Sequence, residues 1–148
     1  MTVAAVIQAR MKSTRLPGKV LMDICGKTML QRVIERVKAA KYVDEIIVAV
    51  PDTPEDYVIE KTVEALGATV FHGSENDVLE RYYFAVAKRP DIDTIVRVTS
   101  DCPLIDPHII NRAVKRFQCS NADYLFNTND AADLSKHNLY PHGMDVEV

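Results

Sequence analysis

The chain has 148 residues, of which 47% are hydrophobic and 26% charged, and its formal net charge is −3. This length fits a single domain with a sizeable core, and the composition is ordinary for a soluble protein. The overall charge argues against nucleic acid or an anionic membrane as the partner. No apolar run approaches the length of a membrane span, and no signal peptide precedes the first predicted strand.

The cysteines and histidines exclude two further classes of site. Cys25, Cys102 and Cys119 are odd in number and far apart, so they form neither a disulfide framework nor a C-x-x-C pair. We therefore expect a reducing, cytoplasmic setting and three small buried side chains, with a redox-active thiol at Cys102 as the alternative. The histidines lack spacing such as H-E-x-x-H, which argues against a zinc site.

Strands and helices are predicted to alternate along the chain. Apolar runs predict buried strands at residues 3–7, 45–50, 68–71 and 94–98. The first helix is predicted over 28–40, with Thr28 as its N-cap, because apolar residues recur there at helical spacing. The second helix should end at Gly67, a residue suited to the left-handed position after a helix.

The third and fourth helices are predicted from their caps and apolar stripes. After the loop at 72–76, Ser74 or Asn76 is expected to cap a helix. That helix is predicted to bury Leu79, Tyr82, Tyr83 and Val86. Before the last helix, Asp106 and Pro107 supply an N-cap and a first-turn proline. Beyond it, we predict strands at 123–126 and 144–148, separated by a mobile loop at 127–140.

This alternation predicts an α/β fold with a parallel, doubly wound sheet. Right-handed crossovers and a 3-2-1-4 strand order would place the first and fourth strands side by side. Their carboxyl ends would then form a ligand crevice. The loop after the fourth strand contains Asp101, so one acid should face the loop that follows the first strand.

That first loop is strongly basic. No acid appears in it before Asp23, the turn signal Leu16-Pro17-Gly18 stands in its middle, and it carries four cations: Arg10, Lys12, Arg15 and Lys19. A strand followed by a basic loop and a helix suits a polyphosphate ligand. The alternative is a set of solvated surface charges beside a turn.

Two known phosphate-binding motifs are absent from the same stretch. Gly26-Lys27-Thr28 looks like the end of a P-loop, but the required earlier glycine would fall at Leu21. No G-x-G-x-x-G pattern follows the first strand either. Any phosphate site here must therefore be built differently.

Residues 8–19, QARMKSTRLPGK, resemble the N-terminal signature of the cytidylyltransferases that activate acidic sugars. CMP-KDO synthetase and acylneuraminate cytidylyltransferase are familiar members, and the branch called spore coat polysaccharide biosynthesis protein F is the most similar. The resemblance continues through residues 26–30, 99–106 and 143–148. It implies one domain over 1–148 with the three-layer α/β/α, Rossmann-like nucleotidyltransferase fold and a mainly parallel, mixed sheet. It also implies that a C-terminal part found in longer relatives is lacking.

The resemblance further implies a reaction and its cofactor. A sugar hydroxyl would attack the α-phosphate of CTP with Mg²⁺ as cofactor, and the acidic sugar would serve surface or spore-coat polysaccharide synthesis in a homodimer. Arg10 and Lys19 match the phosphate-contacting residues of the family, and Arg15 matches a second arginine. Asp101 and Asp145 match its metal-binding acids. For Asp101 the alternative is a turn cap, and for Lys12 we prefer a surface charge.

Weaker matches concern the rest of the nucleotide and the acceptor. The backbone of Ala9 is expected to approach the nucleotide closely. The base and ribose are expected at Gly73, Ser74 and Asp77, although Ser74 can instead cap a helix and Glu75-Asn76 departs from the better-known members. Thr99 and Arg97 are expected to face nucleotide or acceptor. For Arg97, a structural pairing with a carboxylate is an equally good interpretation.

Two other functions remain open at this stage. A glycosyltransferase of related fold often carries a D-x-D metal motif, and Asp91-x-Asp93 fits that pattern but precedes the fourth strand instead of following it. A nucleotide-binding remnant without catalysis is the second alternative.

Overall fold

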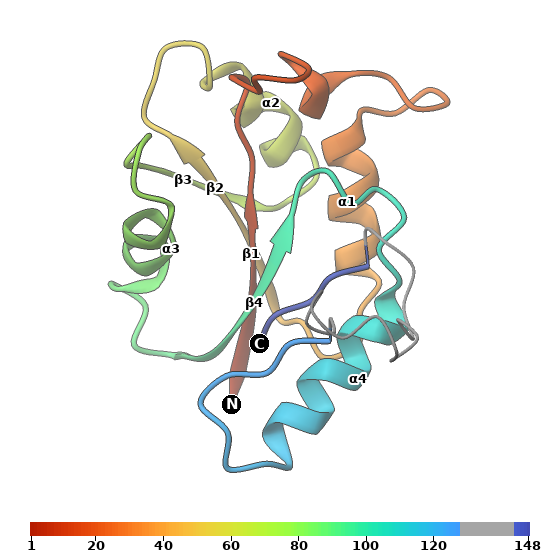
Figure 1. Ribbon diagram of the computed structural model, residues 1–148, viewed down its shortest axis with the longest axis vertical. Coiled ribbons are helices and arrows are strands. Elements are labelled where there is room, and N and C mark those ends of the chain that lie inside the picture. The colour runs from red at the N-terminus through yellow and green to blue at the C-terminus, as the bar shows by residue number, and fades with distance from the viewer. Residues whose placement is uncertain (128–143) are drawn as a thin grey trace.

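The computed structural model describes residues 1–127 and 144–148, and its centre is a sheet with helices on both faces (Figure 1). Its strands pair in parallel in the order β3-β2-β1-β4, which confirms the predicted order. They are β1 (Thr2–Gln8), β2 (Glu45–Pro51), β3 (Thr69–Gly73) and β4 (Ile92–Thr99). The carboxyl ends of β1 and β4 therefore lie side by side.

The helices divide unequally between the two faces. On one face pack α1 (Met29–Lys38), α2 (Val58–Ala65) and α4 (Pro107–Gln118), whose buried residues join the larger core cluster. On the other face, α3 (Val78–Val86) packs over a smaller cluster (Figure 1). Successive residues of β1 alternate between the two clusters, as the period of a strand requires. The result is the predicted three-layer α/β/α arrangement.

Local signals in the sequence set the ends of several helices. The Thr28 hydroxyl accepts a hydrogen bond from the Gln31 N–H at 3.1 Å. The Asp106 carboxylate accepts one from the His108 N–H at 2.8 Å, with Pro107 in the first turn of α4. Gly67 follows α2 with a φ of 66°, in the left-handed region. The three predicted caps are confirmed.

The predicted start and buried stripe of α3 are wrong in part. Its N-cap is Asp77, whose carboxylate accepts from the Glu80 N–H at 2.8 Å. Leu79 and Tyr83 are 80% and 63% exposed instead of buried. The inner face of the helix instead carries Arg81, Tyr82 and Ala85, which are buried. The buried face of the helix thus includes a charged residue that lies outside the predicted apolar stripe.

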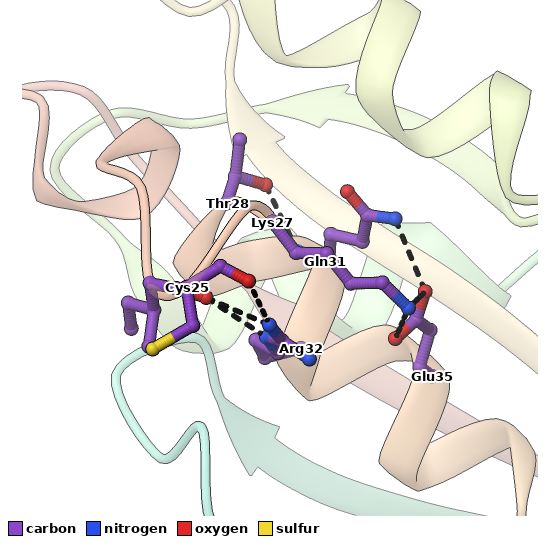
Figure 2. Close-up of polar contacts among 7 residues, drawn as sticks. Cys25, Lys27, Thr28, Gln31, Arg32 and Glu35 are labelled. Atoms are coloured by element: carbon purple, nitrogen blue, oxygen red, sulfur yellow. Dashed lines mark hydrogen bonds and ion pairs between the residues drawn. The ribbon is translucent and has the colours of Figure 1, made fainter.

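The turn before α1 is held by side chains of that helix (Figure 2). The Arg32 guanidinium donates to the carbonyl oxygens of Ile24 and Cys25, at 2.8 and 2.6 Å from Nη2. Lys27 pairs with Glu35 at 2.7 Å. Cys25 takes a positive φ of 52° in this turn, so the segment that resembles a P-loop end is a tight connection into the helix.

The cysteines differ from the prediction. Cys102 is buried, as expected, but Cys25 and Cys119 are exposed. Cys25 lies at a turn and Cys119 directly follows α4, and residues at such positions stay in water because the chain reverses there.

Beyond α4 the described chain adds antiparallel pairing at the β4 edge. The Arg97 N–H donates to the Glu147 carbonyl at 2.8 Å, and the Val148 N–H donates to the Leu125 carbonyl at 2.8 Å. Isolated bridges join residue 147 to both 97 and 126, so the strands predicted at 123–126 and 144–148 are reduced to short pairings. The mobile loop predicted at 127–140 lies outside the described residues from 128 onward. None of the described helices combines the length and apolar character needed to cross a membrane.

Candidate active site

A hollow of about 210 Å³ opens where the carboxyl ends of β1 and β4 meet, and we call it the β1–β4 cleft. Its walls come from the loop after β1, the loop after β4 and the first half of α3. It gathers six of the residues predicted from the sequence: Ala9, Arg10, Arg15, Lys19, Thr99 and Asp101. The basic loop and the acid after β4 therefore share one cleft, as the topology predicts.

The basic loop is fixed at its base by a buried carboxylate. Asp56 is 1% exposed, and its two oxygens accept from the Met11 N–H and from the Thr53 hydroxyl, each at 2.6 Å. The loop then returns to the same point, because the Gly18 N–H donates to the Met11 carbonyl at 2.8 Å. Gly18 has a φ of 71° and leads into the 3-10 helix η1 (Lys19–Leu21). These contacts place Lys19 on the wall of the cleft.

Lys19 and Asp101 join the two sides of the cleft. Lys19 Nζ lies 2.7 Å from Asp101 Oδ2. This hydrogen bond lowers the pKa of Asp101, against the opposing effect of its burial. The Asp101 carboxylate is therefore ionised at neutral pH and already has a cation beside it.

Asp145 lies in the segment 144–148 and is exposed. Burial raises the pKa of the Cys102 thiol, the Thr99 hydrogen bond and Lys19 oppose this, and the charges of both Asp101 and Asp145 raise it further. The two carboxylates thus act on the same thiol, one from each segment. A buried thiol with a raised pKa is poorly reactive, which argues against the redox alternative for Cys102.

The chemistry of these two acids fits a magnesium ion, although only Asp101 is among the residues that line the β1–β4 cleft. Within residues 1–127 and 144–148, no three His, Cys, Asp or Glu side chains are grouped as a complete metal cage. Mg²⁺ does not require one, since it usually keeps several waters and binds one or two carboxylates together with substrate phosphates. Asp101 and Asp145 are acids of that kind.

The residues expected to contact base and ribose lie on the loop from β3 to α3. Gly73, Ser74 and Asp77 are not among the residues that line the cleft. Their observed contacts are structural: the Ser74 hydroxyl accepts from the Asp77 N–H at 3.1 Å, and Asp77 caps α3. A Cβ at Gly73 would lie 2.8 Å from Phe71 Cε1 and 3.1 Å from Arg81 Cγ. Their contact with a nucleotide stays a prediction.

We expect Gly73→Ala to lower the free energy of unfolding by about 1–3 kcal/mol, because the added methyl group must displace Phe71 and Arg81. Urea titration measures the change. Ser74→Ala is the control in the same loop, and removal of its exposed hydrogen bond should cost less than about 1 kcal/mol. Equal stability of Gly73→Ala and the parent chain would contradict the close packing.

Arg97 has a different environment from the cleft cations. Its guanidinium forms an ion pair with Glu147 and lies 5.7 Å from the centre of the Tyr82 ring. It borders a second hollow of about 650 Å³ whose lining also includes Leu79 and Tyr124. The geometry favours the structural pairing, and the acceptor role stays a prediction.

Lys12 behaves as the surface charge that we preferred. Its amino group pairs with Glu75 at 3.1 Å, and the side chain is 53% exposed. It does not line the β1–β4 cleft.

Sequence reasoning missed Arg81. This side chain lines the cleft from α3 and is only 3% exposed. The sequence carried no clear signal for it, because Arg81 lies outside the apolar stripe predicted for that helix. The other lining residues that were not predicted are polar or small apolar side chains of the same loops and of α3: Gln8, Ser13, Thr14, Val20, Val78 and Ser100.

Comparison with known proteins shows to which family the chain belongs. The family profile described as Cytidylyltransferase matches residues 4–147. The chain belongs to the cytidylyltransferase family. Spore coat polysaccharide biosynthesis protein SpsF of Bacillus subtilis is 33% identical over 129 residues, which is 84% of this chain and 53% of SpsF.

Two solved structures are similar in sequence as well as in fold. A cytidylyltransferase from Leptospira borgpetersenii is 37% identical with a TM-score of 0.86, and the match covers 99% of this chain and 59% of that one. A CMP:2-keto-3-deoxy-manno-octonic acid synthetase complexed with CTP is 31% identical with a TM-score of 0.72, covering 82% and 49%. The nucleotidyltransferase fold is thus confirmed. The present chain spans about half the length of the relatives that it matches.

Proposed function

We propose that the protein is a magnesium-dependent cytidylyltransferase that transfers CMP from CTP to an acidic sugar. The observation that carries this proposal is the meeting of Arg10, Lys19 and Asp101 in one cleft at the carboxyl ends of β1 and β4. Similarity to a synthetase solved with CTP supports CTP as the nucleotide. Similarity to SpsF supports a place in surface or spore-coat polysaccharide synthesis.

In this reaction a sugar hydroxyl attacks the α-phosphorus of CTP. A new P–O bond forms to the sugar oxygen, whose proton passes to water, while the bond from the α-phosphorus to the bridging oxygen breaks and pyrophosphate leaves. Arg10, Arg15 and Lys19 bind the triphosphate and stabilise negative charge as it shifts to the leaving group. Arginine suits this work because its planar guanidinium can bind two phosphate oxygens together.

Asp101 and Asp145 would hold the magnesium ion. When bound, Mg²⁺ supplies charge neutralisation on the phosphate oxygens. Before the ion binds, the 2.7 Å contact with Asp101 would hold the Lys19 amino group at the wall of the cleft.

The remaining predicted residues complete the substrate sites. The Ala9 backbone and Thr99 would border the nucleotide from the β1 and β4 ends. Gly73, Ser74 and Asp77 would contact the base and ribose. Arg97, on the second hollow, would face the acceptor. A homodimer is part of the same proposal, and analytical ultracentrifugation of the purified chain tests it.

The Asp91-x-Asp93 pattern does not support the glycosyltransferase alternative. Asp91 pairs with Arg89 at 2.9 Å, and Asp93 accepts from the Thr2 N–H at 2.8 Å. Both acids lie at the start of β4, the opposite end of that strand from Asp101. They are therefore badly placed to join the β1–β4 cleft.

One incubation tests the proposed function. The chain is mixed with CTP, Mg²⁺ and a panel of acidic sugars, and pyrophosphate release is measured. We expect release that requires one sugar of the panel and is lost in Asp101→Asn. Binding of CTP without release would favour a nucleotide-binding unit that does not catalyse. Release of a nucleoside diphosphate from a nucleotide sugar would favour the glycosyltransferase.

A further inference from the structure

A buried cation on α3, Arg81, lines the cleft, and no carboxylate in the described part of the chain forms an ion pair with it. We propose that Arg81 is a further phosphate-binding residue of this site and contacts the triphosphate from the wall opposite the basic loop. The inference rests on the proposed function and adds a residue that neither the family signature nor the charged loop contains.

The first support is the burial of an incompletely paired side chain. Arg81 is 3% exposed, and its Nε is buried with no hydrogen-bond partner among residues 1–127 and 144–148. The guanidinium donates through Nη1 to the Ser74 carbonyl. No described carboxylate forms an ion pair with it, although the charge of Asp56 acts on it at longer range. Burying a cation in this way is unfavourable unless an anion joins it.

The second support is a neighbouring cation on the other wall. Arg10 lines the same cleft from the loop after β1. Burial lowers the pKa of Arg81, the charge of Arg10 lowers it further, and Tyr82 and Asp56 oppose these effects. Two cations that repel each other across a cleft define a site for an anion, because an anion between them converts the repulsion into two attractions.

The chemistry of the donors favours phosphate over the base or the ribose. The guanidinium is planar and only its Nη1 has a described hydrogen-bond partner, and an edge of such a group can match two phosphate oxygens. An uncharged base or a ribose hydroxyl would satisfy a donor but would leave both cations without neutralisation. The small volume of the cleft, about 210 Å³, also brings any bound phosphate near both walls.

The test is isothermal titration of the parent chain and Arg81→Met with three probes: CTP, cytidine and inorganic tripolyphosphate. The variant should bind CTP and tripolyphosphate about tenfold or more weakly, the loss expected for one charge-assisted contact. Cytidine should bind both proteins alike. An equal loss for cytidine and CTP, or no loss for any probe, would overturn the assignment to phosphate. If the parent chain itself does not bind CTP, both the proposed function and the assignment of Arg81 fail.

The melting temperature of the unliganded proteins distinguishes a structural role of Arg81 from a role in phosphate binding. Removal of an unpaired buried charge should leave Tm unchanged or raise it, whereas a structural arginine would lower it. A lower Tm with unchanged CTP affinity would overturn the proposal. Arg81→Lys keeps the charge without the planar fork, so it should lose less affinity than Arg81→Met, and it carries the test if the methionine variant does not fold. Arg116→Met, an exposed residue of α4 outside the cleft, should match the parent chain for all three probes.

Discussion

Replacing Lys19 with methionine is expected to change two affinities in opposite directions. CTP should bind about tenfold to a hundredfold more weakly, because one charge-assisted contact to phosphate is lost. Mn²⁺, measured without nucleotide by electron paramagnetic resonance, should bind about fivefold more tightly. The amino group 2.7 Å from Asp101 competes with the metal, and two unit charges about 4 Å apart in water interact by about 1 kcal/mol.

The opposite signs distinguish this arrangement from a general loss of structure. Lys12→Met removes the same charge from the same loop, but Lys12 pairs with Glu75 and lies outside the cleft. It should leave both affinities unchanged. A parallel loss of CTP and Mn²⁺ binding in Lys19→Met would contradict the competition for Asp101.

Replacing Asp56 with alanine is expected to lower the free energy of unfolding by about 3 kcal/mol. The change leaves the partly buried Met11 N–H and the buried Thr53 hydroxyl without their acceptor, and each hydrogen bond to a charged group contributes about 1.5–3 kcal/mol. Chemical denaturation followed by circular dichroism measures the change. CTP affinity should fall as well, because the base of the basic loop is released.

Asp52→Ala is the matched control for this prediction. Asp52 lies four positions earlier on an exposed part of the same connection, where it accepts from the Tyr57 hydroxyl at 2.7 Å. Exposed substitutions of this kind usually change stability by about 0.5 kcal/mol or less. If both variants unfold at the same denaturant concentration, Asp56 does not anchor the loop.

The architecture was largely predictable because local and long-range signals agree. Apolar runs in the sequence predicted β1 to β4. Thr28 and Asp106 predicted helix starts because their side chains can cap a helix, and Gly67 predicted a helix end because glycine readily takes a positive φ. Topology rules then placed β1 beside β4. These signals act within a few residues or follow from chain handedness, so a single sequence contains them.

Errors arose where tertiary packing overrides the local pattern. The apolar residues Leu79 and Tyr83 suggested the buried stripe of α3, but Arg81 lies on the inner face instead. Hydrophobic periodicity cannot predict a buried cation, because its burial depends on the cleft that the cation faces. Cys25 shows the same limit, since its turn keeps a small side chain exposed.

The residues of the candidate site differ in how well the sequence predicts them. The cations of the basic loop follow from charge and position, and their meeting with Asp101 follows from topology. Asp145 lies 44 positions from Asp101 in the sequence, so spacing alone gave no signal, and only the family resemblance suggested it. Arg81 carries no motif and became visible once α3 was placed against the cleft.

Titration of CTP into the chain, with and without Mn²⁺, tests the central claim most directly. The claim is that the β1–β4 cleft binds a nucleoside triphosphate and that Asp101 binds the metal beside it. We expect binding that Mn²⁺ strengthens in the parent chain, an affinity reduced about a hundredfold or more in the Arg10→Ala, Lys19→Ala double variant, and no strengthening by Mn²⁺ in Asp101→Asn. CTP binding that is the same in the parent chain and the double variant would contradict the account.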